Sequence, residues 1–473
     1  MSASAPDQLS SSSPTHRYRW WVGGLLLFAF AVRLLAWLPF APVEDLRGDE
    51  SYYVRMAESI AAGEGHPGSF RPPLYPTLMA VVLRLGGGLD AIRLVQILLS
   101  TALVAGVYDL ARRRFGPAAG LAAGLACALQ PALVHYSHFL WSEGLAAALL
   151  VLTLWLLERW RTSRQRGFLL AAGAALGLTA LTKEVWLFFT AVGALWVVWQ
   201  LAPGSDRLSF RQIPQTLRAG LRQGWKPALL FCAAAAAVVL PWTVRNTAVH
   251  GAPVVISTCR WMPIAVGNLL PEDDWLLGDG LGGPLRKAAP EGMSELEAEA
   301  YWRQIALESI GAEQPAWLFK KLARNNVRLW SVHSQTVRFV ENEWIPGLSR
   351  STAVVLLSTE VGLYLLLMVA ALAGLWLVPD PHFKPLMLAA LLLTIGVHVL
   401  ANAIPRFHVP ILPLLMLYAG ALLGALSGSV GLLSRAQRWR WAGAAATVGL
   451  FLLLVAAGWQ RSMEPAFKAL EKL

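Results

Sequence analysis

Long apolar runs that carry almost no charge constrain the fold of this 473-residue chain more than any other feature. Examples are Trp20 to Phe40, Phe139 to Leu157 and Leu386 to Leu400, and a helix needs about 20 such residues to cross a bilayer. Strands of a membrane barrel alternate polar and apolar residues, and these runs do not alternate. With 56% hydrophobic and 15% charged residues, the sequence predicts an all-α polytopic membrane protein.

The positive charges of the chain indicate its topology and do not indicate a nucleic-acid partner. The formal net charge is +11, but the basic residues form short clusters between the apolar runs, and such clusters mark the cytoplasmic side of a membrane. The three cysteines give no disulfide framework, because Cys127 and Cys232 lie inside apolar runs and Cys259 stands alone in a loop. We therefore expect membrane lipids as the surroundings and no nucleic acid as a partner.

Placing all the basic clusters on one side gives a single path with about eleven spanning helices, the N-terminus inside and the C-terminus outside. The clusters are Arg17 and Arg19, Arg112 to Arg114, Arg159 to Arg166, Arg207 to Lys226, and Arg435 to Arg440. The expected spans are 18–38, 92–111, 117–135, 138–158, 167–182, 185–201, 227–243, 352–378, 386–403, 407–428 and 440–459. The short apolar stretch from Pro72 to Leu85 carries Arg84, so we expect an outer juxtamembrane or re-entrant helix there.

This path divides the chain into five parts. We expect a disordered cytoplasmic tail over 1–16, an N-terminal transmembrane core over 17–243 with a first outer loop at 39–90, a large outer helical loop over 244–350, C-terminal transmembrane helices over 351–460 and an outer tail over 461–473. In the large loop, Ser294 and Glu297 have the spacing of a capping box. Further along, apolar residues such as Phe319 and Leu322 alternate with Lys321, Arg324 and Arg328, as in a helix that lies in an anionic interface.

The densest polar group lies in the first outer loop. Asp49 and Glu50 are adjacent there and are followed by Tyr52, Arg71 and Tyr75. Two neighbouring carboxylates at a membrane surface need cations, hydroxyls or a metal nearby, and a carboxylate held rigidly suits a general base for a hydroxyl acceptor. The alternative is a solvated turn with an incidental acidic pair.

The expected outer ends of several helices also carry polar groups. They are Glu143, Lys183, Arg245 with Asn246, and Arg406 with His408. Any one of them could simply reach the interface with its polar end. Because they gather on one face, the cations are candidates for binding a phosphate, which needs fixed positive charges.

Two other patterns give weaker evidence of a functional site. His135 and His138 lie three apart, but no cysteine or third histidine accompanies them, so packing at the interface is favoured over a zinc site. The run Gly86 to Gly88 lacks the Lys-Ser or Lys-Thr of a phosphate loop. The sequence therefore argues against a nucleotide sugar as the direct donor.

The ordered set of loop motifs resembles a known family. Gly48-Asp49-Glu50-Ser51-Tyr52-Tyr53 and then Arg71-Pro72-Pro73-Leu74-Tyr75-Pro76 are similar to the first outer loop of bacterial glycosyltransferases related to dolichyl-phosphate-mannose protein mannosyltransferases, which have the GT-C fold. Ser142-Glu143, Pro241 to Asn246, and Arg406-Phe407 follow in the same order. The lipid A aminoarabinose transferases share this layout.

The resemblance implies an inverting transfer of a sugar from a polyprenyl-phosphate carrier to a hydroxyl of a glycan, lipid or protein. Asp49 would activate the acceptor, with Glu50 in the same acidic motif, while Arg71 and Tyr75 would shape the pocket and Arg245 and Arg406 would bind the lipid phosphate. It further implies a site on the outer face of a bacterial inner membrane. A divalent metal occurs in some relatives, and neither the sugar, the acceptor nor the oligomeric state follows from the sequence.

Two readings from other classes compete with this one. A transporter or flippase of isoprenoid-linked sugars would also be helical, but internal repeats and paired broken helices are not evident in the sequence. A scaffold that only binds isoprenoid lipid would not need Asp49 and Glu50, so replacing that pair distinguishes an enzyme from a scaffold.

Overall fold

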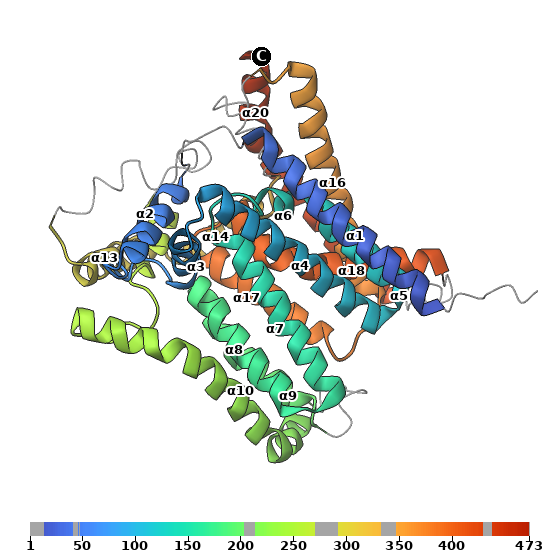
Figure 1. Ribbon diagram of the computed structural model, residues 1–473, viewed down its shortest axis with the longest axis horizontal. Helices are drawn as coiled ribbons and strands as arrows, with labels where there is room; N and C mark the ends of the chain where they lie inside the picture. Colours follow the sequence, from blue (N-terminus) through green and yellow to red (C-terminus); the bar gives the residue numbers. More distant parts are fainter. Residues whose placement is uncertain are drawn as a thin grey trace, which may run out of the picture.

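The computed structural model describes residues 14–40, 46, 48–202, 213–269, 292–332, 347–428 and 438–472. In these parts of the chain the regular structure consists of helices, without a strand (Figure 1). The all-α prediction is therefore confirmed. Most of the expected N-terminal tail, the 203–212 end of a basic connection and Arg47 of the first loop lie outside the described residues.

Each expected span coincides with a helix. The helices are α1 (Pro14–Trp37), α4 (Leu89–Phe115), α5 (Pro117–Leu129), α7 (Glu143–Ser163), α8 (Arg166–Thr182), α9 (Phe189–Trp199), α10 (Ile213–His250), α16 (Arg350–Leu377), α17 (Lys384–Leu400), α18 (Leu412–Gly428) and α20 (Arg438–Lys472). Six described stretches are long and apolar enough to cross a membrane, and they include parts of α1, α4, α10, α16 and α20 and the region Pro405–Leu426. The figure of about eleven crossings stays a prediction.

The expected spans 117–135 and 138–158 were wrong at their shared boundary. The chain leaves the helix at Gln130, whose extended backbone precedes Pro131, and a short helix α6 (Pro131–His135) follows. A proline disfavours helical backbone at the residue before it, which accounts for the break. Turns then continue to Ser142, so α7 begins at Glu143 and this carboxylate lies in the first turn, not five residues inside the helix as the expected span 138–158 implies. A negative charge is stabilised at that end of a helix.

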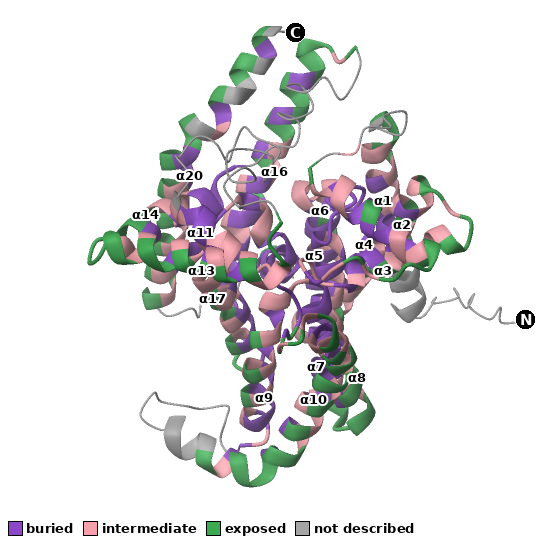
Figure 2. Ribbon diagram, turned by 90° about the vertical axis from the view of Figure 1, so that its left-hand side faces the viewer, coloured by how far each residue is buried: buried purple, intermediate pink, exposed green. Residues whose placement is uncertain are grey.

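The centre of the molecule is a tightly packed helical bundle. Helix α18 contacts α5, α4 and α16, and Figure 2 shows buried residues concentrated where α4, α5 and α7 meet. Backbones approach closely at α18, because a Cβ atom at Gly420 would overlap the backbone of Ala123 in α5. Small residues allow such contacts in membrane helices. The bundle therefore provides a rigid support for the loops at its ends.

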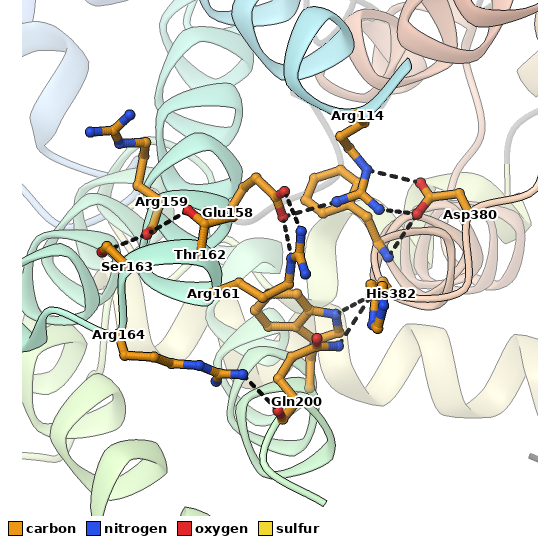
Figure 3. Close-up of polar contacts among 12 residues, drawn as sticks. Arg114, Glu158, Arg159, Arg161, Thr162, Ser163, Arg164, Gln200, Asp380 and His382 are labelled. Atoms are coloured by element: carbon orange, nitrogen blue, oxygen red, sulfur yellow. Dashed lines mark hydrogen bonds and ion pairs between the residues drawn. The ribbon is translucent and has the colours of Figure 1, made fainter. Parts of the chain in front are cut away.

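Ion pairs connect α4, α7 and the connection between α16 and α17 at one end of this bundle. Arg114 of α4 forms ion pairs with Glu158 of α7, at 2.9 Å, and with Asp380 of the connection between α16 and α17 (Figure 3). Trp196 Nε1 of α9 donates a hydrogen bond of 2.7 Å to the carbonyl of His382 in the same connection. Glu158 lies 15 residues after Glu143 on α7, which is roughly 22 Å along the helix axis. The two ends of α7 thus carry separate polar clusters.

The described parts of the two segments expected on the outer side contain short helices. The first loop contains α2 (Asp49–Ala62) and α3 (Leu74–Arg84), and the large loop contains α11 (Trp261–Leu269), α13 (Glu295–Ala312) and α14 (Trp317–Trp330). Helix α3 has 11 residues, roughly 16 Å, which is too short to cross a bilayer. The capping box at Ser294 and Glu297 is confirmed. Figure 1 shows α2 and α13 on the same side of the molecule.

Helix α14 has the expected mixture of apolar and basic residues, and two of its basic residues are buried against the protein. Phe319 and Leu322 are exposed, whereas Lys321 and Arg328 are buried against the rest of the protein. Lys321 Nζ donates a hydrogen bond to the carbonyl of Gly267. Burial, together with Arg324 and Arg328, lowers the pKa of Lys321 to about 8. Lys321 thus binds a backbone group of the protein, while Phe319 and Leu322 face outward and Trp330 at the end of the helix is buried.

Candidate active site

The first residue of the site is Gly48, whose backbone conformation favours glycine. Gly48 precedes α2 with φ of 54°, and a Cβ atom there would meet the ring of Trp141 at 3.5 Å. Other residues rarely adopt such a positive φ. This turn places Asp49 at the N-terminus of α2, where a carboxylate is favoured.

Both carboxylate oxygens of Asp49 bind an arginine. Arg71 Nη2 lies 3.2 Å from Oδ1, and Arg406 Nη2 lies 2.7 Å from Oδ2. The three side chains are between 13% and 20% exposed, so the pairs are largely removed from water. Burial alone would raise the pKa of Asp49, but Arg406 and Arg71 together hold it well below its usual range. Asp49 is therefore ionised at neutral pH.

The chain of charges continues from Arg406 into the bundle. Its Nε atom lies 3.7 Å from Glu143 Oε1, and Lys183 Nζ donates a hydrogen bond of 2.7 Å to the same oxygen. Five charged residues from distant parts of the sequence thus form one cluster, in the order Arg71, Asp49, Arg406, Glu143, Lys183. Two carboxylates face three cations, so the cluster carries one excess positive charge. An anion can neutralise it.

Two buried donors of the cluster lack a hydrogen bond, although Arg406 Nε lies 3.7 Å from Glu143 Oε1. Arg71 Nε and Arg406 Nε are buried and make no hydrogen bond to any residue that the structure describes. The guanidinium of Arg406 also lies over the ring of Trp141, with 5.0 Å between Cζ and the ring centroid. Sequence reasoning missed Trp141, since one tryptophan among 21 carries no signal of its own. This cation–π contact attracts the guanidinium group to the ring.

Three of the other expected residues, Glu50, Tyr52 and Tyr75, make contacts close to the charged cluster. Glu50 is buried and accepts a hydrogen bond of 2.8 Å from the amide of Leu140, and Tyr75 donates one of 2.7 Å to Gln96. Tyr52 lies beside Arg71, whose Cζ is 6.0 Å from its ring centroid, and burial raises the pKa of Tyr52 to about 12. These residues anchor α2 and α3 beneath Asp49.

The acidic pair does not fit a metal held jointly by both carboxylates. The oxygens of Asp49 are engaged by two guanidinium groups, and Glu50 binds the backbone at Leu140. Among the described residues, no group of three histidine, cysteine, aspartate or glutamate side chains is arranged to hold a metal ion.

Arg245 and Asn246 do not join the charged cluster. Arg245 donates hydrogen bonds to the carbonyls of His66 and Gly68, at 2.6 and 3.2 Å, and to Ser69 Oγ at 2.9 Å. Asn246 accepts one of 2.8 Å from the same hydroxyl. The two residues therefore clamp the loop that leads to Arg71. An arginine near the outer face was expected to meet a phosphate, but nearby backbone carbonyls bind it instead.

His408 does not bind Asp49 or Glu143 but lines a cavity together with Arg406. It is buried, with Nδ1 2.7 Å from the carbonyl of Leu329, and its ring stacks on Trp330 at a centroid distance of 5.5 Å. A small cavity beside it extends to His135, whose Nε2 lies 2.5 Å from Glu360 Oε1. His135 thus pairs with a carboxylate that the sequence did not single out.

Comparison with known proteins agrees with the resemblance seen in the loop motifs. Residues 70–213 match the family described as dolichyl-phosphate-mannose-protein mannosyltransferase, and this region contains Arg71, Glu143 and Lys183. No curated protein matches the chain by sequence.

Solved structures are similar to this chain over nearly its whole length. The oligosaccharyltransferase of Archaeoglobus fulgidus in the apo form aligns with a TM-score of 0.52 and 14% identity, over 98% of this chain and 56% of that chain. Its complex with zinc and sulfate gives 0.50 and 15%, over 96% and 52%. ArnT from Cupriavidus metallidurans bound to undecaprenyl phosphate gives 0.42 and 16%, over 87% and 78%. This chain thus spans about half the length of the oligosaccharyltransferase, and the expected GT-C fold is confirmed.

Proposed function

We propose that this protein of GT-C fold is an inverting glycosyltransferase that moves a sugar from a polyprenyl-phosphate carrier to a hydroxyl of a glycan, lipid or protein. The observation that carries the proposal is the cluster of Arg71, Asp49, Arg406, Glu143 and Lys183, in which an ionised carboxylate touches cations that outnumber the acids. A sugar phosphate brings the anion that such a cluster lacks. The family matched over 70–213 is named for a donor of this kind.

In the proposed reaction the acceptor oxygen attacks the anomeric carbon from the side opposite the phosphate. The new carbon–oxygen bond forms while the bond to the phosphate oxygen breaks, and its electron pair leaves on the polyprenyl phosphate. Asp49 takes the proton of the acceptor hydroxyl. Arg406 and Lys183 stabilise the charge that develops on the leaving phosphate. A single displacement of this kind inverts the anomeric carbon.

Donor binding would also prepare Asp49 for its role. With both oxygens held by guanidinium groups, Asp49 is a weak base. A phosphate that competes for Arg406 would weaken this ion pair and raise the pKa of Asp49. The carboxylate would thus become more basic when the donor is in place. This coupling would limit proton removal to the loaded enzyme.

The proposal is tested by following a labelled sugar. Purified protein in lipid nanodiscs should transfer label from a polyprenyl-phosphate sugar to a component of the cell envelope, and the corresponding nucleotide sugar should give no transfer. Movement of the intact lipid-linked sugar between leaflets, without loss of the sugar, would instead indicate a transporter or flippase.

We further propose that the site faces the outside of the membrane, as a bacterial inner-membrane enzyme open to the periplasm or exterior. Basic residues Arg112 to Arg114 end α4, and they mark the cytoplasmic side. In a variant without the native cysteines, a cysteine at Arg113 should react with an impermeant thiol reagent only after the membrane is opened. A cysteine at the exposed Gly88, before α4, should react in intact cells. Labelling of the Arg113 position from outside would reverse the orientation.

A further inference from the structure

Ser69, two residues before Arg71 in the first loop, is held by the large loop through both its backbone and its side chain. Its amide donates a bifurcated hydrogen bond to the two carboxylate oxygens of Glu295, at 3.1 and 3.0 Å. Its carbonyl accepts one of 2.9 Å from the amide of Thr258, and its hydroxyl donates one of 2.8 Å to Asn246 Oδ1. Ser69 is fully buried, and these contacts satisfy all of its polar groups.

Glu295 makes the contact that comes from farthest along the chain. It is the first residue of α13 and lies 226 residues after Ser69. The same carboxylate accepts a hydrogen bond of 2.9 Å from Thr258 Oγ1, and His250 Nε2 lies 3.6 Å from its Oε2 atom. Glu295 therefore connects the first loop to the end of α10, to the segment that follows α10 and to α13.

Gly68 leaves the space that this carboxylate occupies. A Cβ atom at Gly68 would overlap Glu295 Oε1. The φ angle of Gly68 lies outside the left-handed region, so another residue can adopt its backbone conformation. A methyl group at position 68 would therefore displace the carboxylate of Glu295 without straining the backbone.

The position of Ser69 bears on Arg71 because the chain between them is so short. Arg71 lies between Ser69 and the start of α3 at Leu74, and its Nη2 atom binds Asp49 Oδ1 at 3.2 Å. Arg406 binds the other oxygen of Asp49. In the proposed reaction the donor phosphate competes for Arg406, which leaves Arg71 to orient Asp49 while the donor is bound.

We propose that Glu295 is a positioning residue of the active site, which keeps Arg71 against Asp49 by fixing Ser69. This role rests on the proposed function and extends it to the large loop. Helix α13 contributes no residue to the charged cluster, yet through Glu295 the orientation of the base depends on it. Loss of Glu295 lowers turnover and leaves the phosphate contacts of Arg406 and Lys183 intact.

The test compares turnover with lipid binding in purified protein in nanodiscs. Glu295→Ala removes the carboxylate, and Gly68→Ala displaces it by a different route. The capping box of α13 is untouched by both changes. Glu308→Ala is the matched control, because Glu308 is an exposed glutamate of the same helix that binds Gln304, at 2.8 Å.

We expect Glu295→Ala and Gly68→Ala to lower turnover at saturating donor by roughly 10- to 100-fold, because small misplacements of a catalytic group have effects of this size. The affinity for undecaprenyl phosphate should stay that of the wild type, and the control should change neither quantity. In a protein that already carries Arg71→Ala, adding Glu295→Ala should lower turnover no further, because residues that act through one another are not additive. A general loss of stability would not give this pattern.

Wild-type turnover in both variants would overturn the positioning role and leave the proposed function standing. An equal further loss when Glu295→Ala is added to Arg71→Ala would do the same, as would a loss of lipid affinity in proportion to the loss of turnover. If Glu295→Ala does not fold, as judged by its melting temperature, Gly68→Ala decides the question. A wild type that binds the donor and transfers no sugar would contradict the proposed function itself.

Discussion

Replacing Asp49 by asparagine should lower the rate of sugar transfer by roughly 10²- to 10⁴-fold, which is the usual contribution of a general base. The substitution keeps the shape of the side chain and one oxygen, so it can still accept a hydrogen bond from one of the two arginines, while its NH2 group faces the other. It removes the negative charge and the basicity that the acceptor hydroxyl requires. The turnover number of the purified variant at saturating donor, with its melting temperature as a check on folding, measures this effect.

Glu50→Gln is the matched control for Asp49. The amide oxygen of glutamine can still accept the hydrogen bond from Leu140 that Glu50 accepts at 2.8 Å. We therefore expect a much smaller loss of rate than for Asp49→Asn. A larger loss at Glu50 would exchange the two roles, and an unchanged turnover number in Asp49→Asn would leave the acidic pair as a structural turn.

Replacing Arg406 by alanine should have the second large effect, on donor affinity as well as on rate. The change removes the ion pairs with Asp49 and Glu143, at 2.7 and 3.7 Å, and the cation beside the expected phosphate. Removing one partner of a buried charge pair at a binding site costs about 2 to 5 kcal/mol or more. This corresponds to a fall in affinity of at least about 30-fold. Binding of undecaprenyl phosphate to the protein in nanodiscs measures it.

Two further variants identify the cause of a loss at Arg406. Arg406→Lys keeps the charge without the planar group, so it should retain part of the affinity. Arg84→Ala removes an exposed arginine whose guanidinium binds only the carbonyls of Ile60 and Ala61 among the described residues, and it should bind the lipid normally. Unchanged affinity in Arg406→Ala would remove this residue from the phosphate site.

Much of the fold was predictable because a membrane constrains sequence so strongly. Helices need long apolar runs there, and every expected span contains a helix. The break at Gln130 was missed because residues on both sides of it are apolar and the only local signal is Pro131. The burial of Lys321 and Arg328 on α14 was missed for a different reason. Alternating charges indicate two faces, but only the surrounding backbone decides which face is buried.

The site was predictable in its members but not in its pairings. Asp49, Glu143, Lys183 and Arg406 were expected on one face, yet the contact between Asp49 and Arg406 joins residues 357 apart in sequence. Arg245 was expected beside them because it is a cation near the same face, and the carbonyls of the 66–69 loop hold it elsewhere. The pairing of His135 with Glu360 at 2.5 Å was not expected, because Glu360 belongs to no motif. Packing of distant segments decides such contacts.

The most direct test of the account is the fate of the sugar on a polyprenyl-phosphate donor. Purified wild-type protein in nanodiscs, supplied with radiolabelled undecaprenyl-phosphate sugars and envelope extract from cells that lack the gene, is followed for released undecaprenyl phosphate and for label in the acceptor fraction. We predict that the two appear together in equal amounts, that Asp49→Asn reduces both, and that the product has the opposite anomeric configuration to the donor. Donor that is bound by the wild type but keeps its sugar under these conditions would contradict the assignment as a glycosyltransferase.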